Sequence, residues 1–310
     1  MGFGKGCFAE THPLALGVFG TFGTPAANAC VAEADVVIVV GSKLGASDTA
    51  REAAALLDPR RQTFIQIDVE PRNAAWTFPS DHVLIGDAAM VLDQLGERLA
   101  QPLHDGGARV ARHRADRGYF DPPQAASDAS PVMPQRIIAE LQRALPVDGI
   151  VTCDAGENRI FMTHYYQTRQ AGGFLQAAGA GPMGFAIPAA MAAKLVHPER
   201  AVVAVCGDGG FSMTMNGLFT AVEERIPIIV LVFNNHALGW SMHLRGPFGT
   251  EFARFDHAAI AESIGCVGIR VTQPGELAGA FERALAADVP VVIDVETSLD
   301  ATYHDVTYTG

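Results

Sequence analysis

The chain has 310 residues, of which 49% are hydrophobic and 18% charged, and it carries a formal net charge of -12. This length allows two domains with sizeable cores, and the composition excludes extensive disorder. The acidic balance, with no basic cluster longer than Arg60-Arg61, argues against binding to nucleic acid or to anionic membranes, because both need a basic surface.

Five cysteines are spread along the chain without a C-x-x-C spacing. This pattern favours reduced thiols over a disulfide framework or a zinc site. The sequence also contains no signal-peptide pattern and no apolar run of 18 or more residues. We therefore expect a cytoplasmic protein that has no contact with a membrane.

Residues 1–100 follow the order expected of a partial, doubly wound Rossmann-like domain. Residues 1–20 include five glycines and no strand of normal length, so the domain looks cut at its start. A helix is expected near residues 26–34, and strands are expected at 36–40, 64–69 and 82–85. A second helix is expected to carry an apolar face formed by Met90, Val91, Leu92, Leu95 and Leu99.

Residues 101–132 contain Gly106-Gly107, Pro122-Pro123 and scattered arginines, and we predict a linker there. A second domain, residues 133–310, begins with a helix that has apolar residues at core spacing. Its expected strands are 149–153, 173–176, 201–206, 228–233, 267–271 and 291–295. The expected helices between them include 218–224, 258–264, 276–286 and one from the glycine-rich run 179–184 to about 195. This alternation predicts a doubly wound α/β domain with a mainly parallel sheet.

Two neighbouring strands of this second domain end in polar tips. Gly207-Asp208-Gly209-Gly210 follows the strand at 201–206. Asn234-Asn235 follows the strand at 228–233, and 24 residues separate Gly209 from Asn234. Because crossover connections place the carboxyl ends of parallel strands at one edge, Asp208 and Asn235 are expected to converge. Carboxylate and amide oxygens suit Mg²⁺, and the glycine N–H groups suit a phosphorylated ligand.

Two simpler interpretations compete with a metal-diphosphate site. Gly179 to Gly184 form G-x-G-x-x-G before a helix, and Asp208 follows 24 residues later, which is close to the dinucleotide fingerprint of a NAD-type dehydrogenase. That interpretation leaves the pairing of Asp208 with Asn234-Asn235 unexplained. An isolated Gly-Asp-Gly-Gly could also be only a turn whose aspartate caps the next helix.

The combination of GDG, a short gap and NN resembles the diphosphate and metal signature of thiamine-diphosphate-dependent enzymes. The surrounding residues look most like the acetolactate-synthase-like branch. The resemblance implies that the Asp208 and Asn235 side chains and the Ala237 carbonyl bind Mg²⁺, while the N–H groups of Gly209 and Gly210 contact the diphosphate. It further assigns cofactor binding to Gly156, Glu157, Asn158, Gly181, Met183, Gly207 and Leu238.

Several positions near this motif have more specific expectations. Met183 matches the bulky residue that wedges the cofactor into a bent conformer, with the Gly181 carbonyl and the Met183 N–H facing the aminopyrimidine. The Glu157 carboxylate would be repelled by a diphosphate, so we expect it to point away. Trp240 stands where family members often have Met and is a candidate pocket residue. His236 and His243 are candidate acid–base groups.

The resemblance also implies what the chemistry needs from elsewhere. It implies decarboxylation or carboligation of 2-oxo acids, as a lyase or transferase, with an activating glutamate from the pyrimidine domain of a neighbouring subunit. Nothing in this sequence matches the setting of that glutamate. We therefore expect a chain that is inactive or nearly so alone, and that acts in a homo-oligomer or with a separate pyrimidine-domain subunit. A non-catalytic cofactor-binding module is a further alternative.

FAD is a second cofactor of some members of the resembled family, held in their central domain. Asp68 and Glu70 end the strand at 64–69 and could hold the ribose of an ADP group. However, Phe22 replaces the His that the family usually has in Gly-x-His-Gly, and residues 41–45 lack the family's Arg-Phe-Asp-Asp pattern. We therefore do not expect FAD, although the acidic pair leaves room for it.

Overall fold

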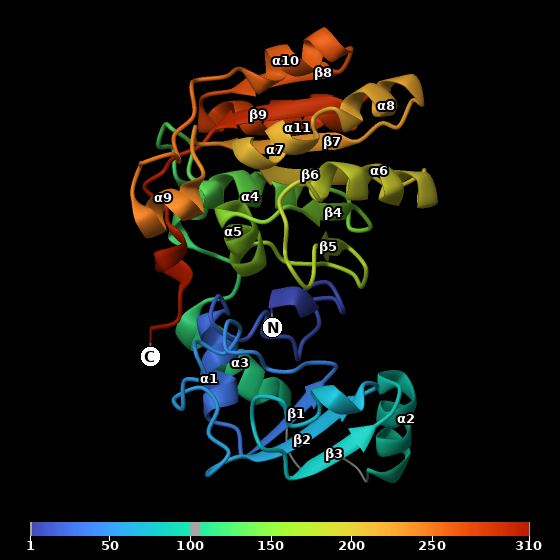
Figure 1. The fold of residues 1–310 in the computed structure, drawn as a ribbon, viewed down its shortest axis with the longest axis vertical. Coiled ribbons are helices and arrows are strands. Elements are labelled where there is room, and N and C mark those ends of the chain that lie inside the picture. The colour runs from blue at the N-terminus through green and yellow to red at the C-terminus, as the bar shows by residue number, and fades with distance from the viewer. Residues whose placement is uncertain (1, 100–105, 310) are drawn as a thin grey trace. The chain divides into compact units, whose positions relative to one another are not determined.

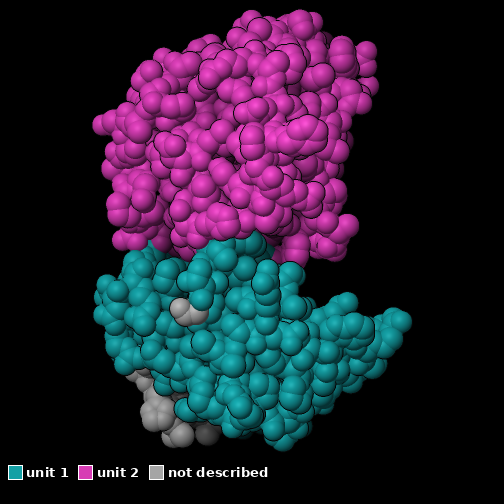
Figure 2. All heavy atoms as spheres, turned by 60° about the vertical axis from the view of Figure 1, so that its left-hand side comes forward, with its two compact units in different colours: residues 1–2, 13–119, 307–310 teal, residues 3–12, 120–306 magenta. Residues whose placement is uncertain are grey.

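The computed structural model describes residues 2–99 and 106–309 and divides into two compact units (Figure 2). Unit 1 comprises residues 1–2, 13–119 and 307–310, and unit 2 comprises residues 3–12 and 120–306. The short segment 3–12 was expected in the first domain, and its place in unit 2 corrects that boundary. The segment is bonded to the rest of unit 2 through Glu10, whose N–H donates to the Thr168 carbonyl and whose carboxylate accepts the Thr168 N–H, both at 2.7 Å. The same carboxylate pairs with the buried Lys5 at 2.7 Å.

Unit 1 contains a three-stranded parallel sheet in the order β1-β2-β3 (Figure 1). Its strands, β1 (Val36–Val40), β2 (Thr63–Asp68) and β3 (His82–Ile85), fall within one residue of the predicted positions. Helix α1 (Pro25–Ala32) begins after Thr24, whose hydroxyl accepts the Ala27 N–H at 3.2 Å. This hydroxyl satisfies one of the N–H groups that a helix leaves without a partner at its start.

Helices α2 and α3 of unit 1 each differ in one respect from the sequence-based expectations. Helix α2 (Ala88–Arg98) forms where it was predicted, but the apolar face expected of it is not buried: all of its residues are described, and none is buried. Helix α3 (Gly106–Arg117) occupies part of the predicted linker, which corrects that prediction for these residues. It packs against α1 and buries Val110 and His113, while Arg112 pairs with Glu33 at 3.1 Å and Arg114 donates to the Ala15 carbonyl. Residues 101–105 of the predicted linker lie outside the described residues.

Unit 2 contains a six-stranded parallel sheet in the order β5-β4-β6-β7-β9-β8. This confirms the predicted doubly wound α/β fold. The strands are β4 (Ile150–Cys153), β5 (Phe174–Gln176), β6 (Val202–Gly207), β7 (Ile229–Asn234), β8 (Val267–Val271) and β9 (Val291–Glu296).

Helices cover both faces of this sheet (Figure 1). One apolar core lies between the sheet and α4 (Pro134–Ala144), α5 (Glu157–Tyr165) and α11 (Leu277–Leu285). The other lies between the sheet and α6 (Ala186–Val196), α8 (Gly217–Glu223) and α10 (His257–Ile264). Burial on both faces explains why β6 and β7 are nearly continuous runs of apolar residues.

Two short helices were not predicted. Helix α7 (Asp208–Thr214) starts within the GDGG motif, and α9 (Gly239–Arg245) follows the paired asparagines. Glycine has low helix propensity, so the start of α7 at Asp208-Gly209-Gly210 depends on the tertiary contacts described below. Among the helices formed by the described residues, none is long and apolar enough to cross a bilayer, and all five cysteines are free.

Candidate functional site

A pocket lies at the carboxyl ends of the central strands of unit 2. It encloses about 640 Å³ of empty space, including its open mouth, and its lining includes the segments 155–158, 207–210 and 237–241. The chain leaves β4 toward one edge of the sheet and later returns beside it in β6, so the strand order reverses here. This is the position at which open α/β sheets bind ligands.

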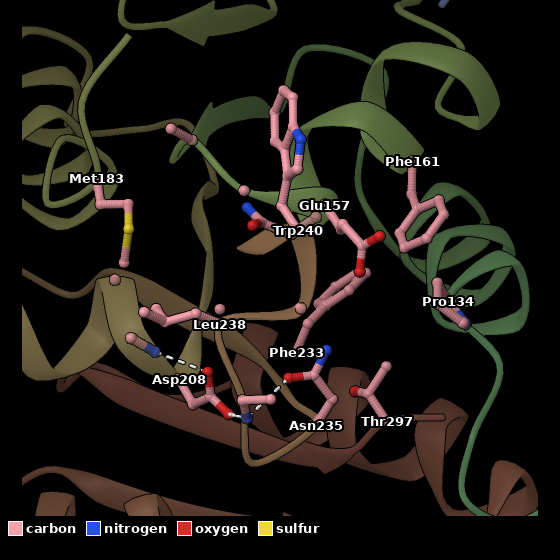
Figure 3. A pocket seen from close by; sticks show the side chains of 18 of the residues that line it. Pro134, Glu157, Phe161, Met183, Asp208, Phe233, Asn235, Leu238, Trp240 and Thr297 are labelled. Carbon is pink, nitrogen blue, oxygen red and sulfur yellow. Dashed lines mark hydrogen bonds between the residues drawn. The ribbon is translucent and has the colours of Figure 1, made fainter. Parts of the chain in front are cut away.

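Asp208 and Asn235 converge in this pocket, as the strand order predicted (Figure 3). In the sheet register Gly207 lies opposite Phe233, which brings both polar tips to the same level. The Ala237 N–H joins them, because it lies 3.0 Å from Asp208 Oδ2 and 3.2 Å from Asn235 Oδ1. The other oxygen of Asp208 accepts the N–H of Gly209 at 2.7 Å.

Asp208 is only 4% exposed, and this burial raises its pKa to about 6 although hydrogen bonds from Gly209 and Ala237 act in the opposite direction. The folded-state pKa of Asp208 lies above the ordinary value of about 4. Protonated Asp208 therefore contributes its full stabilisation of the folded state below about pH 4, and this contribution is lost as the pH rises through about 6. In the absence of metal, we therefore expect the free energy of unfolding of wild type to fall as the pH rises from about 4 to about 7. This fall should exceed that of Asp208→Asn by up to about 3 kcal/mol.

Urea unfolding of the two proteins at several pH values in the presence of a chelator measures this difference. The Asp208→Asn variant is the control, because it keeps the size of the side chain and removes its titration. Parallel pH profiles for wild type and variant would contradict the expected contribution of Asp208.

The glycines of the motif are closely approached by other side chains. A Cβ atom on Gly209 would lie 2.7 Å from Leu238 Cδ2 and 2.9 Å from Met183 Cε, and one on Gly210 would lie 2.3 Å from Asp154 Oδ2. The absence of side chains lets the start of α7 pack directly beneath the pocket. Figure 3 shows Met183 and Leu238 on the same side of the pocket as Asp208.

Asp154 is a key residue of the site that sequence reasoning did not single out. It is 1% exposed and accepts the N–H groups of Gly184 at 2.9 Å, Phe185 at 2.6 Å and Ala186 at 2.6 Å. Burial raises the pKa of Asp154, while these three hydrogen bonds lower it. The carboxylate thus anchors the loop that carries Met183 and the start of α6 to the end of β4.

Asn234 has a different role from Asn235. Its side chain is fully buried, and its amide nitrogen lies 2.9 Å from Asp294 Oδ1 and 3.1 Å from His257 Nδ1. Burial acts to raise the pKa of Asp294, but His257, with Asn234 and Arg270, holds that pKa below its ordinary value. This network fixes the end of β7. Of the two adjacent asparagines, Asn235 lines the pocket and Asn234 does not.

Neither candidate acid–base histidine lines the pocket directly. His236 Nε2 lies 2.9 Å from Glu296 Oε1, and His243 Nδ1 lies 2.7 Å from Glu157 Oε1. Glu157, whose carboxylate was expected to point away from a diphosphate, engages His243 but still forms part of the lining. The same oxygen accepts the N–H of Tyr303 at 3.0 Å, a contact from a segment that the sequence left without assignment.

Within residues 2–99 and 106–309, no group of three or more His, Cys, Asp or Glu side chains could hold a metal ion by itself. At the strand ends the pocket offers the Asp208 carboxylate, the Asn235 amide oxygen and backbone carbonyls, while the second carboxylate of the lining, Glu157, is bonded to His243. Such a donor set suits Mg²⁺, which keeps several waters and is usually bound by one or two carboxylates together with phosphate oxygens.

Comparison with known proteins agrees with this geometry. Residues 154–295 match the family "Thiamine pyrophosphate enzyme, C-terminal TPP binding domain", and residues 1–95 match "Thiamine pyrophosphate enzyme, central domain". The chain belongs to the thiamine pyrophosphate enzymes. The G-x-G-x-x-G run lies inside the first match, so it no longer supports a dinucleotide-binding domain in this thiamine pyrophosphate enzyme.

Its curated relatives include acetolactate synthase subunits. A "Probable acetolactate synthase large subunit" of Methanocaldococcus jannaschii is 33% identical over 306 residues, which cover 94% of this chain and 51% of the relative. The "Acetolactate synthase isozyme 3 large subunit" of Escherichia coli is 32% identical over 298 residues, covering 91% and 50%. A "Pyruvate oxidase" of Lactiplantibacillus plantarum is 29% identical over 302 residues, covering 94% and 49%. The chain thus spans about half the length of these relatives.

Proposed function

We propose that unit 2 binds thiamine diphosphate through Mg²⁺ and takes part in the decarboxylation or carboligation of 2-oxo acids. The observation that carries this proposal is the convergence of Asp208 and Asn235 around one backbone N–H at adjacent strand ends. Membership of the thiamine pyrophosphate enzymes and similarity to acetolactate synthase large subunits support it.

The residues present fit this cofactor and metal. Asp208 is a buried carboxylate with a raised pKa, and a divalent cation beside it would stabilise its ionised form. Asp208, Asn235 and the Ala237 carbonyl would hold the Mg²⁺. Gly209 and Gly210 lie in the first turn of helix α7, and their backbone N–H groups would contact diphosphate oxygens. The Gly209 N–H, which donates to Asp208 Oδ1 in this structure, would change partner on binding.

The chain's own residues bind and orient in this proposal. Bound there, thiamine diphosphate would supply a nucleophilic carbon and an electron sink for the reaction of a 2-oxo acid. Met183 and Leu238 would support its bent conformer from one side, while Gly156 and Asn158 would form the opposing loop. Trp240 would help to exclude water from the reacting end, where a dry environment strengthens electrostatic interactions.

The activating carboxylate would come from outside residues 1–310, either from another segment or from another chain. We therefore propose that activity requires a pyrimidine-domain partner or a homo-oligomer that supplies one. The similarity to large subunits supports a partner subunit. We do not propose FAD, and five free cysteines support a reducing compartment such as the cytoplasm.

A thermal-shift titration tests cofactor binding. With thiamine diphosphate at about 100 times its Kd and excess Mg²⁺, a ligand that binds only the folded state adds about 2.7 kcal/mol. For a domain of this size, we expect the Tm of unit 2 to rise by about 5–10 °C. NAD with Mg²⁺ is the matched control and should leave the Tm unchanged. A rise with NAD but not with thiamine diphosphate would contradict the proposal and restore the dinucleotide alternative.

Activity measurements separate an enzyme from a non-catalytic module. The purified chain with both cofactors should decarboxylate 2-oxo acids negligibly, and a pyrimidine-domain partner should restore the reaction. Turnover at ordinary enzyme rates by the chain alone would contradict the proposed dependence on a partner.

A further inference from the structure

One oxygen of Glu157 holds two separate segments against the pocket. Oε1 accepts from His243 Nδ1 at 2.7 Å and from the Tyr303 N–H at 3.0 Å. An ionised carboxylate can only accept hydrogen bonds, so the histidine nitrogen is the donor. His243 belongs to α9, and Tyr303 begins the 3-10 helix Tyr303–Val306 near the end of the chain. The Glu157 side chain is only 3% exposed.

The same two segments carry an aromatic pair. Trp240 lies three residues before His243 on α9, and its ring centroid is 5.7 Å from that of Tyr303. Trp240 lines the pocket, and Figure 3 shows it beside Glu157. A buried, charge-assisted hydrogen bond to each segment is stronger than the contact between two rings. Glu157 is thus a hydrogen-bond acceptor common to the two segments that carry the pair.

The Glu157 carboxylate would weaken the binding of a diphosphate in the pocket by electrostatic repulsion. A Cβ atom on Gly239 would lie 2.5 Å from Glu157 Oε2, so the second oxygen faces the turn that follows the predicted metal ligands. There it would repel a bound diphosphate. Glutamine would avoid this repulsion, but as a neutral acceptor it would make weaker hydrogen bonds to His243 and Tyr303.

We propose that Glu157 is a positioning residue that fixes the Trp240–Tyr303 pair as the aromatic wall of the substrate subsite. The assignment of this wall to a substrate rests on the proposed function; the positioning itself does not. The wall would limit the subsite to 2-oxo acids with small side chains, because the large side chain of Trp240 lines the pocket.

Trp240 fluorescence tests the positioning directly. The chain has two tryptophans, and Trp76, which is exposed and lies in unit 1, can be replaced in a Trp76→Phe background. In that background Glu157→Ala should shift the emission of Trp240 to longer wavelength and speed hydrogen exchange of the Tyr303 amide by at least about tenfold. Glu157→Gln keeps an acceptor oxygen and should restore most of both signals.

A second buried glutamate provides the matched control. Glu140 on α4 is paired with Arg136 and Arg143, and Glu140→Ala should leave Trp240 emission and Tyr303 exchange unchanged even if it lowers the Tm. Wild-type signals in Glu157→Ala, or equal changes in Glu140→Ala, would overturn the positioning role.

Calorimetry with thiamine diphosphate and Mg²⁺ tests the link to the site. Glu157→Gln should bind about threefold to tenfold more tightly than wild type, because one repulsive charge is removed. Equal or weaker binding would show that the carboxylate does not face the diphosphate and would overturn that part of the argument. No binding to wild type would instead overturn the proposed function, and with it the substrate subsite, whatever the fluorescence shows.

Discussion

Replacement of Asp208 by alanine is expected to weaken Mg²⁺-dependent binding of thiamine diphosphate by more than about a hundredfold. Asp208 meets Asn235 at the strand ends, and it accepts the N–H groups of Gly209 and Ala237. Its removal would therefore take away a proposed metal ligand and free the turn that presents Asn235. Calorimetric titration with the cofactor at fixed Mg²⁺ measures the loss.

The fold itself should survive this substitution. In the absence of metal above about pH 6, wild type has to hold an ionised carboxylate in a buried place, a cost that the variant does not have. Asp288→Ala, which removes an exposed carboxylate from the same unit, should bind the cofactor like wild type. Cofactor affinity in Asp208→Ala within a few fold of wild type would place the metal elsewhere.

The sheet of unit 2 and the convergence of its polar tips could be predicted from the sequence. Runs such as 202–206 and 229–233 are apolar throughout, which indicates strands buried on both faces, and turn residues bound them. The handedness and parallel direction of crossover connections then place Asp208 and Asn235 at one edge. Both steps use short-range patterns and a general rule of topology.

The parts that could not be predicted depend on contacts between distant residues. Helix α7 begins in a glycine-rich motif because Gly210 packs beneath Asp154, and propensity gives no sign of this. The bond from Tyr303 to Glu157 spans 146 positions, and the bond from Asn234 to Asp294 spans 60. Such pairs have no local signature in one sequence. The contacts that surround the pocket could therefore not be predicted, although the convergence of Asp208 and Asn235 in it could.

Replacement of Asp154 by alanine should be the most destabilising change at the site. The carboxylate accepts three backbone N–H groups from Gly184, Phe185 and Ala186, and hydrogen bonds to a charged group contribute about 1.5–3 kcal/mol each. The bonds share one acceptor and are not additive, and part of the gain offsets the burial of the charge. We expect a loss of about 3–5 kcal/mol in the free energy of unfolding of unit 2, measured by urea denaturation.

Comparison of Asp154→Asn with Asp154→Ala distinguishes the hydrogen bonds of the Asp154 carboxylate from the packing of its side chain. Asp154→Asn fills the same space but offers one acceptor oxygen and an N–H₂ group that would face N–H donors, so it should recover only a minor part of the lost stability. Asp300→Ala, at an exposed position of the same unit, should change stability by less than about 0.5 kcal/mol. If Asp154→Asn were as stable as wild type, packing would be the main role of Asp154. If Asp154→Asn remained destabilised and bound thiamine diphosphate weakly even when folded, the three hydrogen bonds from backbone N–H groups to Asp154 would hold Met183 in place against the cofactor.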